Sequence, residues 1–206
     1  MTVFGEHIPD ETPVDPSDLV DKRMTTRLEV NLAEARNILL AVVKYMSAKP
    51  SPRQAPFDLA WILELHAEMF GNVWTYAGTK RQIDLNIGIP WHQVEVQLEE
   101  MLRDLQEWKH WLDLIEQAAR LHHRAVAIHP FSGGNGRWSR LLANVWLKQN
   151  DHSPTKWPES DMIGHESSIR GEYIDAIKAA DEGNFEPLVE LHRLFTPADS
   201  QSGDAK

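Results

Sequence analysis

The sequence predicts one mainly α-helical domain that carries a small β-hairpin. The chain has 206 residues, 42% of them apolar, which suffices for a single well-packed core. Apolar residues recur at helical spacing in most segments, and clusters of Pro and Gly separate these segments. One stretch, between Trp74 and Pro90, instead shows glycines and partial alternation, which is typical of a hairpin.

Seven segments have the periodicity of helices. The first starts at Thr26, and its apolar residues alternate steps of four and three: Leu28, Leu32, Ala35, Leu39, Val42 and Met46. The second covers 57–70 and ends at Gly71, and after the hairpin the third covers 91–111. The others are expected at 112–129, at 137–149, at 167–183 and from Phe185 to just before Pro197.

The two ends of the chain lack such periodicity. Residues 1–24 are acidic and Pro-rich, so we expect an extended or disordered arm there. A disordered tail is expected over 197–206, which leaves 25–196 as the helical domain. The first residues have neither a basic start nor an apolar core, so we expect no secretory signal and a cytoplasmic protein.

The composition narrows the function. The net charge of -10 disfavours nucleic-acid binding, and no apolar run is long enough to predict a membrane span. There is no cysteine, which excludes disulfides and thiol nucleophiles. Within this acidic chain, Arg137, Arg140 and the Lys80–Arg81 pair are local basic groups that could attract an anion.

The run HPFSGGNGRWSR, residues 129–140, is the most informative segment. Pro130 pushes the backbone of His129 away from the helical region, so the upstream helix should end there and expose the imidazole. Three glycines then surround one asparagine, an arrangement in which backbone N–H groups can turn toward an anion: Gly133, Gly134, Asn135 and Gly136.

A helix follows this loop directly. Its free N–H groups and its positive dipole end favour phosphate, and Arg137 and Arg140 lie three residues apart on one face. Asn135 could cap this helix or bind a phosphate oxygen, and the two roles are compatible. Phe131 is expected to be a core anchor. The segment therefore predicts a phosphate site with a proton acceptor, His129, beside it.

This segment resembles the signature of Fic-domain proteins (filamentation induced by cAMP), HPFx(D/E)GNGRxxR. Within that family, the chain is most similar to the subgroup labelled mobile mystery protein B, through TTRLEVN, FGNVWTYAG and NIGIPW. The resemblance implies a Fic-type helical bundle with a flap beside the active site. It also implies transfer of AMP from ATP to a Ser, Thr or Tyr hydroxyl of a target protein, with His129 as general base.

The motif departs from the signature at one position, where Gly133 replaces the acidic residue that holds magnesium in the family. Magnesium on a triphosphate usually has a protein carboxylate as ligand, and glycine offers none, so no metal ligand is assigned. Three alternatives follow: slow or absent AMP transfer, a metal held by phosphates alone or another phosphate donor, and a nucleotide-binding module without catalysis.

Three further assignments have structural alternatives. The resemblance suggests Glu29 as an inhibitory residue that pairs with Arg140, but Thr26 and Glu29 also form a capping-box pattern, which we favour. Tyr173 matches the position of an adenine contact in the family, although such a tyrosine commonly lies in a core. His122 and His123 could join His129 at a metal, but their spacing favours helix packing.

Partners follow from the same resemblance. The hairpin is expected to hold the target protein by backbone pairing at its flap residues, Ile87, Gly88 and Ile89. The subgroup also suggests an antitoxin-like partner and, as a second hypothesis, a regulatory nucleotide-binding module of a mobile element or toxin-antitoxin system.

Overall fold

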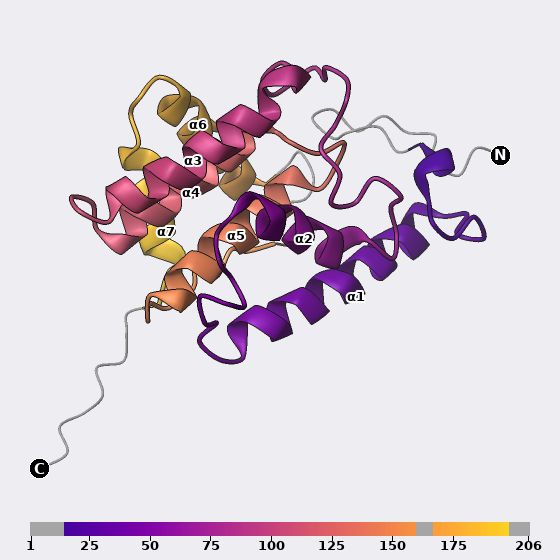
Figure 1. Cartoon of the computed structure of the whole chain (residues 1–206), viewed down its shortest axis with the longest axis horizontal. Coiled ribbons are helices and arrows are strands. Elements are labelled where there is room, and N and C mark those ends of the chain that lie inside the picture. The colour runs from indigo at the N-terminus through magenta and orange to yellow at the C-terminus, as the bar shows by residue number, and fades with distance from the viewer. Residues whose placement is uncertain (1–14, 160–166, 198–206) are drawn as a thin grey trace, which may run out of the picture.

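The computed structural model describes residues 15–159 and 167–197, and Figure 1 shows their arrangement. Over these residues the chain forms seven α-helices: α1 (Arg27–Met46), α2 (Leu59–Phe70), α3 (Val94–Trp108), α4 (Leu114–Ile128), α5 (Asn135–Gln149), α6 (Ser168–Asp181) and α7 (Glu186–Phe195). Two short 3-10 turns, η1 (Pro16–Asp18) and η2 (Trp91–Gln93), precede α1 and α3. The mainly α fold class is confirmed.

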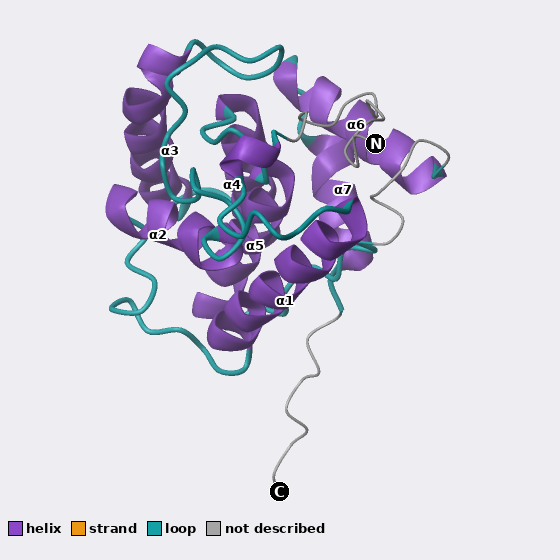
Figure 2. Ribbon diagram, turned by 90° about the vertical axis from the view of Figure 1, so that its right-hand side faces the viewer, coloured by secondary structure: helices purple, strands orange, loops and turns teal. Residues whose placement is uncertain are grey.

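Helices α4 and α5 form the centre of the bundle. They make the most extensive contact of any two elements; α1 and α2 pack against α5, and α6 and α7 against α4 (Figure 2). The largest fully buried side chains include Trp138 and Trp146 of α5 and Phe131 of the preceding loop. The segment that carries the predicted site is therefore held from several sides. Within the described residues, no helix combines the length and apolarity needed to span a membrane.

The start of α5 has no side-chain cap, a feature that it shares with α3 and α7. At four helices, a side-chain oxygen of the N-cap residue accepts a hydrogen bond from a backbone N–H of the first turn; these caps are Thr26, Asp58, Asp113 and Ser167. The N-cap of α5 is Gly134, which has no side chain to offer. The first turn of α5 thus keeps its N–H groups available for another acceptor.

Helix α1 occurs where the periodicity predicts it, but its apolar stripe faces outward. Leu28, Leu32 and Leu39 are 67%, 62% and 60% exposed. The buried face instead consists of Val30, Glu34, Asn37, Ala41 and Tyr45. Glu34 accepts from the indole of Trp74, and Oδ1 of Asn37 accepts from Asn72. The packed side of α1 thus combines apolar residues with polar residues that have partners elsewhere in the fold.

The predicted β-hairpin is wrong: residues 79–90 form an irregular loop (Figure 2). The cause is Arg81, which is buried and donates hydrogen bonds to the carbonyls of Ile83, Ile89 and His129. The carbonyls of this segment bond to one guanidinium, where those of a hairpin would bond to the N–H groups of a neighbouring strand. Arg81 is thereby also excluded as a basic group for an external anion.

The first segment is only partly an open arm. Leu19 is 1% exposed, and the stretch from Asp18 to Val20 bonds with the backbone of Val73 and Thr75. Residues 15–24 therefore pack on the domain, in contrast to the disorder expected for 1–24. Residues 1–14 and all of the predicted tail after Pro197 lie outside the described part of the chain.

Candidate active site

The loop from His129 to Gly134 begins and ends with a residue in the left-handed backbone conformation. Helix α4 ends at Ile128, and His129 adopts φ 52°, so the residue before Pro130 lies in the left-handed region and not in the extended one. Gly134 has φ 78°, where glycine is favoured. Between them the side chain of Asn135 makes two hydrogen bonds of 2.9 Å, one to the N–H and one to the carbonyl of Phe131. Asn135 therefore braces the loop.

His66 of α2 holds the same loop from below. Its ring is stacked on that of Phe131, with 3.6 Å between ring centroids. Its Nδ1 accepts from the N–H of Gly78, so the proton of the neutral ring is on Nε2, which donates to the carbonyl of Gly133. Burial lowers the pKa of His66 to about 3, which keeps this tautomer neutral.

The first turn of α5 presents an anion site. Among the described residues, no acceptor lies within hydrogen-bond distance of the N–H groups of Asn135, Gly136 or Arg137. These groups point out of the positive end of a helix of 15 residues. The N–H groups of the predicted nest are thus without hydrogen bonds in the described structure, while the side chain of Asn135 is bonded to Phe131.

His129 has the tautomer of a base. Its ring is hydrogen-bonded to the backbone of Val126, while its buried Nε2 has no partner among the described residues. The bond to the Val126 carbonyl therefore comes from Nδ1–H, and Nε2 carries the free electron pair. Burial, reinforced by the charge of Arg81, lowers the pKa of His129 to about 4. The ring is therefore neutral at neutral pH.

The predicted docking residues lie beside this base. A Cβ added to Gly88, which has φ 92°, would be only 2.6 Å from Cβ of His129. The Arg81 guanidinium donates hydrogen bonds to the carbonyls of both Ile89 and His129. Ile87 is 49% exposed at the loop surface. The structure thus places Gly88 and Ile89 beside His129 without any strand.

Each arginine of the motif is paired with a carboxylate. Nη1 of Arg137 lies 2.6 Å from Oε2 of Glu34, a residue of α1 that also accepts a 2.6 Å hydrogen bond from the indole of Trp74. Arg140 makes a bidentate pair with Glu159, at 2.9 and 2.5 Å. An incoming phosphate that uses these guanidiniums has to compete with two carboxylates.

A hydrogen-bonded chain runs from Arg140 into the core between α4, α6 and α7. Arg140 bonds the Tyr173 hydroxyl, and Tyr173 lies 3.0 Å from Nε2 of His122. Nδ1 of His122 is 3.0 Å from Nε2 of His192, whose Nδ1 is 3.1 Å from the hydroxyl of Thr155. Thr155 bonds Thr196, which donates to the carbonyl of His192.

The carbonyl of His192 fixes the donor and the acceptor of every hydrogen bond in this series. A carbonyl only accepts, so the one hydroxyl proton of Thr196 is used there, and Thr155 must donate to Thr196. His192 must then donate to Thr155 from Nδ1, and His122 to His192 from Nδ1. Burial lowers the pKa of both histidines, His192 to about 3, so each has a single ring proton. Tyr173 therefore donates to His122 and presents only electron pairs to Arg140.

Gly133, the position of the missing acid, faces a tyrosine. A Cβ added there would be 2.6 Å from the hydroxyl oxygen of Tyr76. The ring of Tyr76 is stacked on Trp74, with 5.5 Å between centroids. No hydrogen-bond partner for this hydroxyl is found in the described part of the chain. Glycine at 133 is thus matched to the tyrosine that lies over it.

Several predicted residues lie elsewhere. Glu29 forms the capping box with Thr26 at the start of α1 and makes no pair with Arg140. Tyr173 lies under Arg140 in the chain described above. His123 pairs with Asp181 at 2.8 Å, and no group of three potential metal ligands occurs in residues 15–159 and 167–197. The packing interpretation of the histidines agrees with these contacts.

Sequence reasoning missed four residues of the site: Glu34, His66, Tyr76 and Glu159. Tyr76 lies within the segment FGNVWTYAG, but nothing in that segment indicates its place over Gly133, and the other three have no motif around them; each acts through a partner elsewhere in the chain. The one signal that the sequence offered was a polar residue on the side of a helix that the apolar pattern assigned to solvent, as at Glu34.

Residues 56–147 match the model of the Fic/DOC family. A curated relative, "Protein adenylyltransferase Fic" of Drosophila grimshawi, is 30% identical over 156 residues, which cover 71% of this chain and 30% of that protein. The chain thus spans about a third of the curated relative's length. The matched residues include the whole motif described above, and the chain belongs to the Fic/DOC family.

Solved structures share the fold. Fic-1 of Caenorhabditis elegans superimposes with a TM-score of 0.62 at 26% identity, over 79% of this chain and 47% of that one. A Fic domain of a putative cell filamentation protein from Bartonella quintana, solved with bound ADP, gives a TM-score of 0.62 at 17% identity, over 86% and 89%. The helical bundle is the fold of these domains.

Proposed function

We propose that the chain is a Fic-type protein adenylyltransferase that moves AMP from ATP to a Ser, Thr or Tyr hydroxyl of a target protein. The observation that carries this proposal is the free electron pair on Nε2 of His129, next to the open N–H groups of α5. The name of the Drosophila relative and the ADP bound by the Bartonella domain support the same chemistry.

In this proposal His129 and the α5 terminus divide the reaction between them. The target hydroxyl oxygen attacks the α-phosphorus of ATP while Nε2 of His129 takes the hydroxyl proton. The bond from the α-phosphorus to the bridging oxygen breaks, and pyrophosphate leaves. The N–H groups of Asn135, Gly136 and Arg137, with the Arg137 guanidinium, stabilise the phosphate charge. Arg137 exchanges Glu34 for a phosphate oxygen in this state.

The loop beside His129 is the proposed docking surface for the target. Leu85 to Gly88 have backbone groups without hydrogen-bond partners in the described structure, which leaves them available to an extended peptide. Gly88 lies against His129. A peptide that pairs with this loop brings its hydroxyl close to the base.

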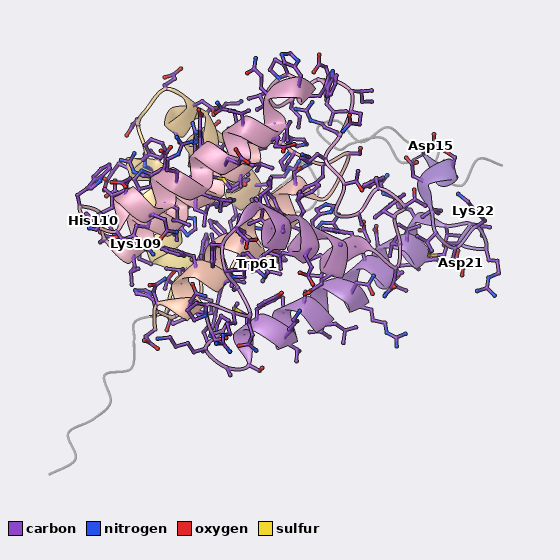
Figure 3. All side chains as sticks on the ribbon, viewed as in Figure 1. Asp15, Asp21, Lys22, Trp61, Lys109 and His110 are labelled. Atoms are coloured by element: carbon purple, nitrogen blue, oxygen red, sulfur yellow. The ribbon has the colours of Figure 1, made fainter. Side chains whose placement is uncertain are left out.

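The test is transfer of label from ATP to proteins of a cell lysate. Wild type should label at least one protein, and His129→Ala should reduce the rate by roughly 10²- to 10⁴-fold, the usual worth of a general base. His110→Ala is the matched control, because His110 lies at the far end of α3, at the left of Figure 3. Equal labelling by wild type and His129→Ala would remove the proposal.

A second candidate is a nucleotide-binding regulatory module without catalysis, of a mobile element or toxin-antitoxin system. The observation that favours it is that both motif arginines are already paired with carboxylates, while Gly133 offers no acid. The same assay separates the two functions: a protein that binds ATP and labels nothing belongs to this second class. An antitoxin-like partner stays a prediction from the family resemblance.

A further inference from the structure

The place of the family's acidic residue is taken by the side chain of Tyr76. Since a Cβ at position 133 would lie 2.6 Å from the Tyr76 hydroxyl oxygen and 3.5 Å from the ring carbon that bears it, no larger residue fits without moving the ring. The ring is held by stacking on Trp74, whose indole is in turn bonded to Glu34. The hydroxyl therefore stays at the entrance of the nest.

This hydroxyl is a neutral donor that is not yet used. Burial raises the pKa of Tyr76, the charges of Glu34 and Asp18 raise it further, and Arg137 opposes them. The phenol thus keeps its proton at neutral pH. Within the described residues nothing accepts that proton.

The side chains around the nest do not fit a magnesium ion. Such an ion takes oxygen ligands, usually one or two carboxylates beside the phosphates. Gly133 supplies none, and the two oxygens of Glu34 are bound by Arg137 and Trp74. The described residues also hold no cluster of three potential ligands. A hydroxyl donor and two guanidiniums suit phosphate oxygens, which are acceptors, better than they suit a cation.

We propose that Tyr76 replaces the metal as a phosphate ligand, so that this site binds the polyphosphate of a nucleotide without a divalent cation. The proposal rests on the nucleotide binding of the proposed function but concerns only the mode of binding. Tyr76 donates to a phosphate oxygen over Gly133, where the family pattern places an acid and its metal.

The first test uses the wild-type chain and a non-hydrolysable ATP analogue, titrated by calorimetry with excess EDTA and then with magnesium. The expected dissociation constants agree within about threefold, because no group of the protein contacts a metal. Binding that is tenfold or more tighter with magnesium would overturn the proposal.

The second test is Tyr76→Phe, which keeps the stacked ring and removes the donor. Loss of a hydrogen bond to a charged oxygen should weaken binding by about tenfold or more, in EDTA and in magnesium alike. Tyr45→Phe is the matched control: Tyr45 is buried and bonded to Trp61, with no contact to the motif. Equal weakening by both variants, or none by Tyr76→Phe, would contradict the assignment.

The double variant Tyr76→Ala with Gly133→Glu reverses the exchange, since it vacates the space and adds the acid. It should bind the analogue at least about tenfold more tightly with magnesium than with EDTA. These outcomes separate the two proposals. Cation-independent binding without label transfer leaves this inference standing and removes the adenylyltransferase, whereas transfer with strictly magnesium-dependent binding does the opposite. No binding under either condition overturns both.

Discussion

The two arginines of the motif are held in different ways. Arg140 is 9% exposed, and below it a series of five hydrogen-bonded side chains with one fixed proton direction ends on a backbone carbonyl. Arg137 is 37% exposed and is held by Glu34, from a helix that packs at the side of the bundle. The comparison teaches that one end of the site is preorganised, whereas the other has to change partners before it can bind phosphate.

Lowering the pH should destabilise both ends of the site, and this loss of stability is the largest effect that we expect. The folded-state pKa values of His66, His122, His129 and His192 all lie below the ordinary 6.5. Well above pH 6.5 these four histidines are neutral in both the folded and the unfolded state. As the pH falls below 6.5, the unfolded chain takes up protons that the fold refuses, so stability is lost by up to about 1.4 kcal/mol per pH unit for each histidine.

Urea unfolding at pH 7.5, 6.5 and 5.5 measures this loss. For four histidines, the free energy of unfolding should fall by about 1 kcal/mol over the first interval and by about 4 kcal/mol over the second, on the order of the whole stability of a domain. Carboxylates with lowered pKa, such as Asp21 and Glu29, act only at lower pH. A constant stability down to pH 5.5 would contradict the buried neutral histidines.

Thr196→Val tests the preorganised end alone. It removes the hydroxyl that fixes the direction of the chain, so Thr155 becomes free to donate to His192. The free energy of unfolding should fall by about 1–3 kcal/mol, while Thr196→Ser should retain it. In the wild type, nitrogen NMR should find the ring protons of His122 and His192 on Nδ1. Protons on Nε2 of these rings would show that the proposed direction is wrong.

Glu34→Gln tests the exchangeable end and has a smaller expected effect. Glutamine keeps an oxygen for Trp74 and removes the charge that competes for Arg137. Nucleotide affinity should rise roughly three- to tenfold, because the pair is partly screened by solvent. Glu29→Gly is the comparison: it should lose about 1 kcal/mol of stability with the capping box and leave affinity unchanged. Stronger activation by Glu29→Gly would restore the inhibitory role that the family pattern suggests for it.

Local signals predicted the helices and the loop conformation well. Prolines, glycines and capping residues act within a few positions, so the start of α1 at Thr26 and the end of α4 before His129 could be read from the chain. The proposed base and nest could be predicted for the same reason, since their groups are neighbours in sequence.

Long-range polar contacts could not be predicted in this way. The outward face of α1 follows from the partners of Glu34, which lie 40 and 103 residues away. The hairpin was wrong because the guanidinium of Arg81 reaches carbonyls 47 and 48 residues along the chain. Periodicity records only which residues are apolar and contains no information on such pairs.

The absence of a side chain at Gly88 joins two properties that are separate in most enzymes. The loop lies against His129 because position 88 has no Cβ: a Cβ there would be 2.6 Å from Cβ of His129. A larger residue at position 88 has to move either the loop or the backbone of His129. In the proposed function, one glycine therefore affects both the surface offered to a target and the burial that lowers the pKa of His129.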